Sequence, residues 1–384
     1  MVIHYHHAIV PNSGYLKRMK NIDRDLVGLL GEKSVEVEFY SKGKREFVKT
    51  EGQFTLSQNV VKKYYVEMGS NGKLNNIKKI ITFIKLSLKY RPTYVIGEAQ
   101  MLPKLLWVFR MFAPKAKLIF DCHGAVAEEA EYQGRSESDV KAIKKMERNS
   151  TQKVDYIICQ SSVMKQYIHD EYGVDEKRIS VYRCGVDTSL FKINDKREEV
   201  RKHLGIAVDE ILFVYSGGID KWQRVGDSID IFMKYHKVNP KSKFLILTMQ
   251  EDRLKDVFLS KGIVDDGTYI VTSLPFQQVP DYLNACDVAF LLRDNHMMNA
   301  VASPTKLAEY MACGLPVITS EVARCWVDKE GENYCVFEEK TINTDVINSI
   351  IGTDRNAISE YAKKHLSLEA DRMGLTFFVE YLKK

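Results

Sequence analysis

Long hydrophobic runs, paired cysteines and repeats are missing from this sequence. No apolar stretch approaches the roughly 18 to 20 residues that a membrane-spanning helix needs, and the first residues, MVIHYHHAIV, lack the charged segment and long apolar stretch of a signal peptide. The seven cysteines never show a C-x-x-C or Cys/His ligand spacing, which argues against a zinc module or a disulfide framework and favours reduced thiols. We therefore expect a cytoplasmic globular protein.

An excess of charge of one sign is also missing. Lys and Arg number 56 against 51 Asp and Glu, a net charge of +5, which gives no indication of a nucleic-acid partner. The distribution is uneven, because residues 1–190 hold 31 basic and 22 acidic side chains whereas residues 191–384 hold 25 and 29. Only the first half of the chain is basic.

At 384 residues the chain is too long for one ordinary core and suits two domains of about 150 to 200 residues each. Short β-branched and aromatic runs alternate with amphipathic stretches, a pattern typical of parallel sheets covered on both faces. The expected strands form two series: 2–6, 35–40, 94–97, 117–121, 155–159 and 179–182, then 211–218, 243–247, 268–271, 287–292, 315–319 and 334–337. The sequence thus predicts an α/β fold with two Rossmann-like domains.

The polar stretch KINDKREEVRKHLG separates the two series of strands. Charged segments of this kind are typical of domain boundaries. We expect an N-terminal domain over 1–192, a C-terminal domain over 193–366 and a final helix over 367–384. Ligands of doubly wound domains bind beyond the carboxyl ends of the strands, so the site should lie in the cleft between the domains, on strand-to-helix loops.

The sharpest local pattern is SPTKLAEYMACGLPVI, which begins at Ser303. Ser303 is a good N-cap, Pro304 fits the first helical turn, and Gly314 closes the helix. The pattern predicts a short, well-delimited helix over 304–313.

The start of this helix suits an anionic ligand. Its backbone amides and positive dipole end favour a diphosphate, and Thr305 and Lys306 add a hydroxyl and a charge. Glu309 lies one turn further on, where a carboxylate can accept two hydrogen bonds from a ribose diol. The alternative is an ordinary capped helix with a solvated Lys and Glu.

The same run resembles the second-domain signature of the GT-B glycosyltransferases, specifically the retaining enzymes of family 4. That signature has two glutamates separated by seven residues, the second followed by an A-x-G-x-P-V-I-like stretch. Glu309 matches the second glutamate, and the stretch after it is matched by Ala312, Gly314, Pro316 and Val317. The resemblance implies a GT-B fold, a nucleoside diphosphate sugar as donor, and a role of Glu309 in donor binding.

The first glutamate of the signature is missing, because Val301 occupies its position. In the family this glutamate contacts the transferred sugar. The resemblance therefore leaves Arg293, Asp294 or Asn299 as candidates for recognising the sugar.

A second stretch, FVYSGGIDKWQ, resembles the first strand and glycine-rich turn of the family's second domain. Ser216, Gly217 and Gly218 allow the backbone to approach the diphosphate closely. Gly218 stands where the family has an arginine, so Lys221, and after it Arg224, is expected to supply the cation that stabilises the departing diphosphate. A solvated turn is the alternative for both.

In the first half, FDCHG resembles the family's strand that ends in a histidine at the active site. His123 is expected to hydrogen-bond near the reacting sugar, with a structural histidine as the alternative. The loop VPNSGY follows the first strand, and Gly14 there can let the backbone approach the diphosphate or the acceptor. The final helix matches the family's habit of returning to pack on the first domain.

Asp23 and Asp25 form a D-x-D string, the metal signature of the other major glycosyltransferase fold. That motif ends a strand, whereas residues 15–30 have a helical pattern, in which side chains two apart do not converge. No other His or carboxylate cluster has metal-ligand spacing. We predict that no metal and no cofactor is required besides the nucleotide-sugar substrate.

The stretch NNIKKIITFIKLSLKYRP has an amphipathic, basic helical pattern. Its apolar positions form one face of the helix: Ile77, Ile80, Ile81, Ile84 and Leu88. One interpretation is a helix that covers a sheet and presents a solvated lysine face. The other is peripheral contact of residues 73–91 with the anionic inner face of a membrane, which would suit a lipid-linked acceptor.

These patterns together predict a retaining, metal-independent glycosyltransferase of hexosyl or N-acetylhexosaminyl type. It would move a sugar from a nucleoside diphosphate sugar, with UDP as the expected nucleotide, to a saccharide or lipid-linked saccharide in surface or capsular polysaccharide synthesis. A non-catalytic GT-B partner of another transferase, favoured by Val301 and Gly218, and a nucleotide-sugar epimerase are the alternatives.

Overall fold

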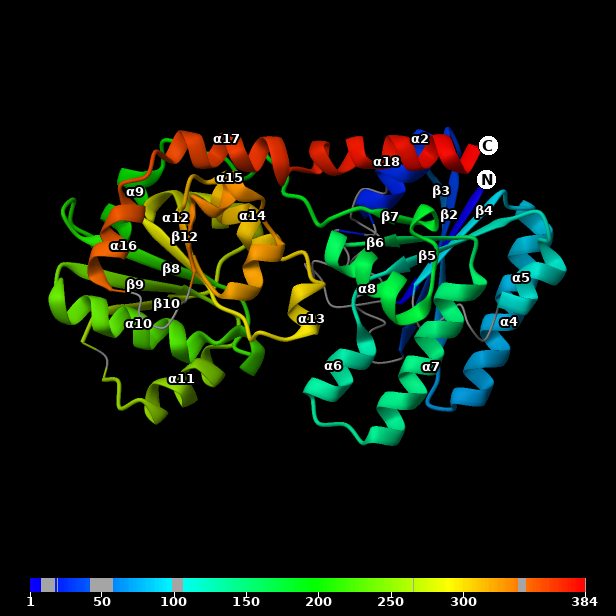
Figure 1. The fold of residues 1–384 in the computed structure, drawn as a ribbon, viewed down its shortest axis with the longest axis horizontal. Coiled ribbons are helices and arrows are strands. Elements are labelled where there is room, and N and C mark those ends of the chain that lie inside the picture. Colours follow the sequence, from blue (N-terminus) through cyan, green and yellow to red (C-terminus); the bar gives the residue numbers. More distant parts are fainter. Residues whose placement is uncertain are drawn as a thin grey trace. The chain divides into compact units, whose positions relative to one another are not determined.

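Contacts within the chain divide it into two units (Figure 1). Unit 1 comprises Met1–Cys184, Val301–Ser303 and Asp371–Lys384, and unit 2 comprises Gly185–Ala300 and Pro304–Ala370. The structure is a computed structural model that describes residues 1–7, 18, 20–41, 58–98, 106–264, 266–337 and 343–383. The first change of unit falls at Cys184, a little before the expected boundary at 192, and each unit is described by itself.

The sheet of unit 1 has seven parallel strands within the described residues, in the order β3-β2-β1-β4-β5-β6-β7. They are β1 Val2–His7, β2 Ser34–Ser41, β3 Val60–Met68, β4 Tyr94–Glu98, β5 Lys117–Cys122, β6 Tyr156–Cys159 and β7 Ile179–Val181. All the strands expected in this half are present. The additional strand, β3, escapes the sequence pattern because its lysines and glutamate break up the apolar run, as is common at the edge of a sheet.

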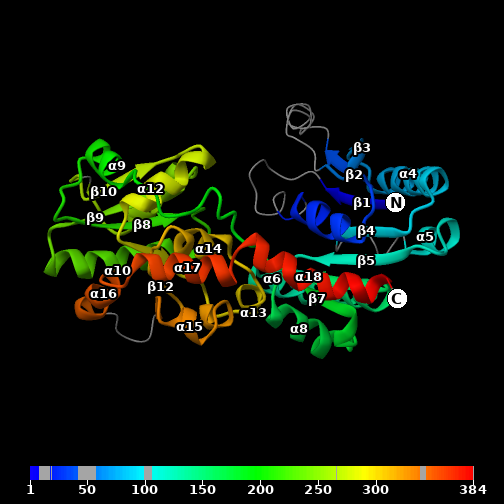
Figure 2. The ribbon, with the colours of Figure 1, turned by 90° about the horizontal axis from the view of Figure 1, so that it is seen from above.

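Helices cover both faces of this sheet (Figures 1 and 2). They are α2 Gly28–Leu30, which continues a π-helical turn at Asp23–Val27, then α4 Gly72–Tyr90, α5 Leu106–Phe112, α6 Val126–Tyr132, α7 Glu137–Lys153, α8 Ser162–Tyr172 and the end of α18 Leu368–Lys383. On one face Phe83 of α4 and Phe109 of α5 pack on Tyr5 of β1, with ring centroids 4.1 and 5.6 Å from the tyrosine ring. Buried aromatic packing of this kind fixes both helices on the sheet.

The last helix, α18, returns to unit 1 from residue Asp371 onward, as the sequence pattern indicates. Its residues Leu375, Val379 and Leu382 join a buried cluster with Val2 and Ile96 of the sheet. This apolar contact covers the sheet face opposite to α4 and α5.

Helix α4 begins at Asn71, whose side chain accepts the Lys73 and Leu74 amides at 3.0 and 3.3 Å. Phe83 and Leu86 are its buried apolar residues. The apolar face expected from the sequence is wrong in part, because Ile77, Ile81 and Leu88 are exposed. The helix buries a face centred on Phe83 rather than on the isoleucines.

Unit 2 has six parallel strands within its described residues, in the order β10-β9-β8-β11-β12-β13, which are the six expected. They are β8 Ile211–Ser216, β9 Ser242–Leu247, β10 Tyr269–Thr272, β11 Val288–Leu291, β12 Val317–Thr319 and β13 Cys335–Phe337. The helices are α9 Arg197–Leu204, α10 Val225–Val238, α11 Glu251–Ser260, α12 Val279–Ala285, α13 Met297–Ala300, α14 Thr305–Ala312, α15 Lys329–Glu332, α16 Thr344–Ile351 and α17 Arg355–His365. The α/β prediction with two doubly wound units is confirmed, whereas the cleft expected between them stays a prediction.

Candidate functional site

Three neighbouring parallel strands of unit 2 end at one edge of its sheet: β8, β11 and β12. The glycine turn follows β8, Arg293 follows β11 and Ser320 follows β12. The Ser216 amide donates to the Tyr310 hydroxyl at 2.8 Å, which holds α14 against the end of β8. The structure therefore brings the glycine turn, Arg293 and the SPTK helix to one place, where doubly wound domains bind ligands.

The turn after β8 has little room for side chains. A Cβ atom on Gly217 would lie 2.9 Å from the Tyr215 hydroxyl, and one on Gly218 would lie 3.0 Å from Gln223 Oε1. The Gly217 amide donates to the Leu247 carbonyl at 3.0 Å, which fixes the turn to β9. A side chain at position 218 would require Gln223 and Gln250 to shift by a few tenths of an ångström.

The two cations expected beside this turn have different surroundings. Lys221 is exposed. Arg224 adopts a positive φ of 50°, is partly buried, and donates from Nε to Asp227 at 2.6 Å. Its Nη1 lies 3.4 Å from Ser320 Oγ, beyond β12, so Arg224 reaches the strand ends. The assignment of either residue to a diphosphate stays a prediction.

Arg293 and Asn299, the candidates for sugar recognition, are both buried. The Arg293 guanidinium lies 4.9 Å from the ring centroid of Trp222, a cation–π contact. Asn299 Nδ2 donates to the Asp294 carbonyl at 2.9 Å, and its own carbonyl accepts the Trp326 indole N–H at 3.2 Å. The contacts of Asn299 hold the loop after β11.

The SPTK helix, α14, starts at Thr305, and its N-cap is Pro304, which provides no side-chain hydrogen bond. The expected cap is wrong: Ser303 Oγ instead accepts the Cys184 amide at 3.1 Å within unit 1. With its hydroxyl bound elsewhere, Ser303 cannot satisfy the first amides of the helix. Gly314 has a φ of +74° after the helix end, as expected for a closing glycine.

Glu309 of α14 is 3% exposed, and its Oε2 accepts from Lys306 Nζ at 2.8 Å. On the opposite side of the helix Leu307 and Met311 are buried in the core of unit 2. Helix α17 lies beside α14 (Figure 2). The Ser359 hydroxyl of α17 donates to the Ala312 carbonyl of α14 at 2.8 Å. The helix is thus held rigidly, with a carboxylate and an ammonium group paired near its start.

Position 301, where the family signature has a glutamate, is not a surface position in this chain. Val301 is 0% exposed within the hydrophobic core of unit 1, and its carbonyl accepts from Ser161 Oγ at 2.7 Å. A charged side chain would not fit this apolar environment.

In unit 1, His123 lies at the carboxyl end of β5 and is hydrogen-bonded through Nε2 to Asp121 Oδ2. The other oxygen of Asp121 accepts from Arg18 Nε at 3.1 Å and Nη2 at 2.7 Å. Burial alone would raise the pKa of Asp121, but the charges and hydrogen bonds of Arg18 and His123 hold it well below the usual range. Asp121 thus stays ionised and fixes the imidazole.

The sequence does not predict a role for Asp121 or Arg18 in the site. Asp121 lies inside the FDCHG motif, two residues before His123, so the motif itself contained the signal. Arg18 is 103 positions away from Asp121 and carries no local pattern.

Two sequence predictions concern other parts of the chain. Gly14 lies outside the described residues. Asp23 and Asp25 are buried, the former accepting from Ser34 Oγ and the latter from the Tyr182 hydroxyl at 2.7 Å. Within the described residues no group of three or more His, Cys, Asp or Glu side chains is arranged to hold a metal ion. Nor does any described helix have the length and apolar character needed to cross a membrane.

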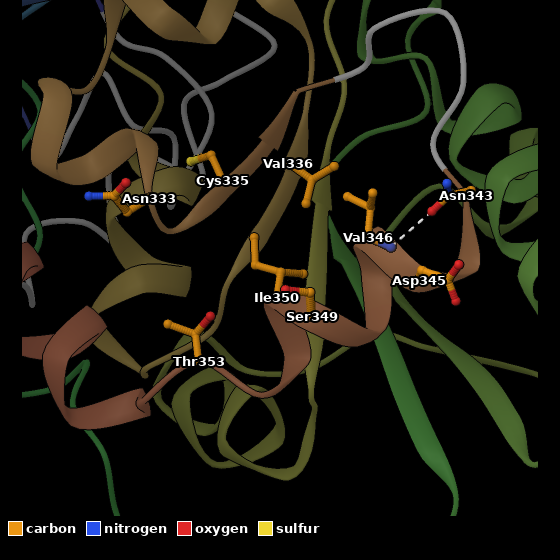
Figure 3. Close-up of a pocket in the computed structure, with 9 residues that line it drawn as sticks. All are labelled: Asn333, Cys335, Val336, Asn343, Asp345, Val346, Ser349, Ile350 and Thr353. Carbon is orange, nitrogen blue, oxygen red and sulfur yellow. Dashed lines mark hydrogen bonds between the residues drawn. The ribbon is translucent and has the colours of Figure 1, made fainter.

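A separate hollow of about 410 Å³ lies beside β13 and α16 in unit 2 (Figure 3). Its lining includes Cys335 and Val336 of the strand and Ser349 and Ile350 of the helix. None of the predicted site residues lines it. The hollow and the edge formed by β8, β11 and β12 are therefore different places in unit 2.

Family models match both halves of the chain. The model described as Glycosyltransferase Family 4 matches residues 24–190, and the model described as Glycosyl transferases group 1 matches residues 210–353. A relative named as a teichuronic acid biosynthesis glycosyltransferase, TuaC of Bacillus subtilis strain 168, is 30% identical over 144 residues, or 37% of this chain. The chain spans about a third of that relative's length (33%).

Solved structures of the same architecture cover the whole chain. HepE of Anabaena, solved in complex with UDP-glucose, has a TM-score of 0.69 at 13% identity and 99% coverage of both chains. Sucrose-phosphate synthase of Thermosynechococcus elongatus has a TM-score of 0.72 at 14% identity, covering 100% of this chain and 99% of that one. At such low identity these structures establish the fold. The two family models identify residues 24–190 and 210–353 as glycosyltransferase domains, and the solved structures show that the fold of the chain is GT-B.

Proposed function

We propose that the chain is a retaining glycosyltransferase that moves a hexosyl or N-acetylhexosaminyl unit from a UDP sugar to a saccharide or lipid-linked saccharide in surface polysaccharide synthesis. The observation that carries this proposal is the meeting of the glycine turn, two arginines and helix α14 at one edge of the unit 2 sheet. This edge combines backbone amides, cations and a carboxylate, the groups that bind a nucleoside diphosphate.

In this proposal each group binds one part of the donor. The amides of Thr305 and Lys306 bind the diphosphate, because α14 has no side-chain cap at its start. Gly217 and Gly218 let the backbone come close to the same phosphates. Glu309 accepts the hydroxyls of the ribose, and Lys306 keeps its carboxylate oriented.

The chemistry requires a stabilised leaving group more than a nucleophile from the protein. The bond between the anomeric carbon and the phosphate oxygen breaks, and the diphosphate leaves with the electron pair. The acceptor hydroxyl forms the new bond on the same face and gives its proton to the departing phosphate oxygen. Cations and amides that hold the diphosphate lower the barrier by stabilising this charge, so retention needs no pair of carboxylates as in a retaining glycosidase.

His123 is the proposed contribution of unit 1 to the reaction, as a hydrogen-bonding group for the reacting sugar. Because Asp121 accepts from Nε2, this imidazole nitrogen carries a proton, and the carboxylate fixes the orientation of the ring. Arg18 holds Asp121 in place.

Two similar proteins support the proposed donor and product. HepE was solved with UDP-glucose, with UDP and glucose, and with UDP. TuaC is named for teichuronic acid biosynthesis. UDP as the nucleotide and a surface polysaccharide as the product are therefore the proposals with the most support.

The test is nucleotide release from UDP, GDP and dTDP sugars, each with and without acceptor extracts and with and without a chelator. We expect release of UDP that increases with acceptor and is unchanged by chelation. Donor binding without turnover would favour the non-catalytic partner instead. Interconversion of the sugar with no acceptor product would identify an epimerase.

We also propose that α4 and α5 contact an anionic membrane surface. Apolar side chains that are between 45% and 63% exposed line these two helices: Leu74, Ile77, Ile81 and Leu88 on α4, and Trp107 and Met111 on α5. The helices pack side by side in both views of Figures 1 and 2. From Lys73 to Lys117 the sequence has ten basic residues and one acidic residue, so this stretch of the chain carries an excess of positive charge that favours an anionic surface.

Co-sedimentation with vesicles tests this contact. We expect the protein to bind vesicles of equimolar phosphatidylcholine and phosphatidylglycerol, and not vesicles of phosphatidylcholine alone. Ile77→Ser with Ile81→Ser should remove most binding, and Lys85→Glu should weaken it about fivefold or more, because each basic residue near the surface contributes about 1 kcal/mol. Met249→Ser, at an exposed apolar site in unit 2, is the matched control. Equal binding by all variants would contradict the proposal.

A further inference from the structure

Arg293 is a buried cation whose charge the described part of the chain does not balance. It is 6% exposed, and no described carboxylate lies within 4.0 Å of its guanidinium. The two other arginines buried to this degree are paired, Arg18 with Asp121 at 2.7 Å and Arg201 with Asp287 at 3.3 Å. Burial lowers the pKa of Arg293, and no carboxylate contributes to raising it again.

The protein contacts of Arg293 use little of its hydrogen-bonding capacity. Nη1 donates to the Leu292 carbonyl at 2.7 Å, and the guanidinium face is covered by Trp222. A guanidinium has five N–H donors and no acceptor. Buried charges in proteins are ordinarily paired or bind an ion, so this arrangement indicates an anionic ligand.

The position of Arg293 identifies the part of the donor that it would meet. It follows β11, the strand between β8 and β12, and its backbone amide donates to Ser320 Oγ at 2.8 Å. Arg224, the neighbouring cation, is already paired with Asp227 and lies 3.6 Å from Asp294. Of the two arginines at this edge, Arg293 is therefore the one whose charge no described carboxylate balances.

We propose that Arg293 binds the diphosphate of the donor and takes the place of the arginine that the glycine turn lacks at Gly218. This inference rests on the proposed function. It assigns Arg293 to the phosphates of the donor instead of to the transferred sugar. The two positions are close because β8 and β11 are neighbours in the sheet. Arg293, which follows β11, can thus bind the phosphates that an arginine after β8 would bind in the family signature.

The experiment compares Arg293→Met, Arg293→Lys and wild type by calorimetric titration with UDP, uridine and inorganic pyrophosphate. We expect Arg293→Met to weaken UDP and pyrophosphate binding about ten- to a hundredfold, the usual cost of a lost charged hydrogen bond, and to leave uridine binding unchanged. Arg293→Lys should fall between the two. Without ligand, Arg293→Met should have a higher Tm than wild type, because the unpaired charge is gone.

Arg324→Gln is the control, since Arg324 lies in the same unit but pairs with Glu321 and Glu332. It should bind all three ligands as wild type does. Unchanged UDP affinity in Arg293→Met, or parallel loss of uridine and UDP with a lower Tm, would overturn the inference in favour of a packing role. If wild type binds pyrophosphate but not UDP, the proposed function fails, and loss of pyrophosphate in Arg293→Met still supports the anion site. Failure of wild type to bind either would overturn both.

Discussion

Replacing Asp121 by asparagine should destabilise the sheet of unit 1 far more than a surface substitution. Asp121 is 0% exposed and Arg18 is 2% exposed, so the substitution leaves a guanidinium buried opposite a neutral group. Breaking a buried ion pair from one side costs about 3 to 5 kcal/mol. Both Arg18 hydrogen bonds end on Oδ1, and asparagine keeps one oxygen that can take this place, so we expect a loss at the lower end, about 3 kcal/mol.

Native-state hydrogen exchange of strands β1 and β5 is the suitable assay, because two units need not unfold in one transition. The variants Asp121→Asn, Arg18→Met and the double variant complete a mutant cycle. Because the two side chains interact directly, the double variant should lose less unfolding free energy than the two single variants lose in sum. A loss below about 1 kcal/mol in Asp121→Asn, or strict additivity, would refute the coupling inferred from the structure.

The difference in unfolding free energy between wild type and Asp121→Asn should depend on pH in one direction. The pKa of Asp121 is held below its usual value of 3.8 in the folded state, so its stabilising contribution is present above that value and is lost as the pH falls. The advantage of wild type over Asp121→Asn should therefore be constant from neutral pH down to the usual pKa and shrink below it. An advantage that instead grows in acid would contradict the ionised state of Asp121.

Three further substitutions test other parts of the structure. Burial raises the pKa of Glu36 from 4.5 to about 7, so the wild type loses stability as the pH rises through this window. Relative to wild type, Glu36→Gln should gain about 3 kcal/mol of unfolding free energy between acidic and alkaline pH, measured by denaturation at each pH. An Ala at Gly314 would place Cβ 2.8 Å from the Arg355 carbonyl at a φ of +74°, whereas Gly205, at +67°, has open space. Gly314→Ala should therefore lower Tm by more than Gly205→Ala, and equal shifts would refute the clash. Tyr310→Phe removes the acceptor of a β8 amide and should cost about 1 to 3 kcal/mol in unit 2, with hydrogen exchange at the end of β8 as the readout.

Much of the fold can be predicted because the strands of doubly wound units are short β-branched runs with a clear local pattern. The strand that escapes prediction, β3, has lysines and a glutamate that interrupt its apolar run, as is common at the edge of a sheet. Helix α4 shows a different limit: its pattern contains more apolar residues than one buried face can hold. Whether Phe83 or Ile81 faces the sheet depends on tertiary packing, which the periodicity alone does not contain.

The candidate site divides in the same way. Glycines and the helix start have local patterns, and Gly217, Gly218 and α14 indeed lie at one edge of the sheet. The pairing of Arg18 with Asp121 and the unbalanced charge of Arg293 depend on residues far apart in the sequence, so no local pattern contains them. At Ser303 the local pattern predicts a helix cap that is not formed, because the Ser303 hydroxyl accepts the Cys184 amide of another segment.

Hydrogen exchange with and without UDP tests most directly whether the donor binds at the ends of β8, β11 and β12. We expect slower exchange in the amides of residues 216–224, 292–299 and 305–309, and no change in those that line the hollow between Asn333 and Thr353. Protection confined to that hollow or to unit 1, with none at the glycine turn or the start of α14, would contradict it.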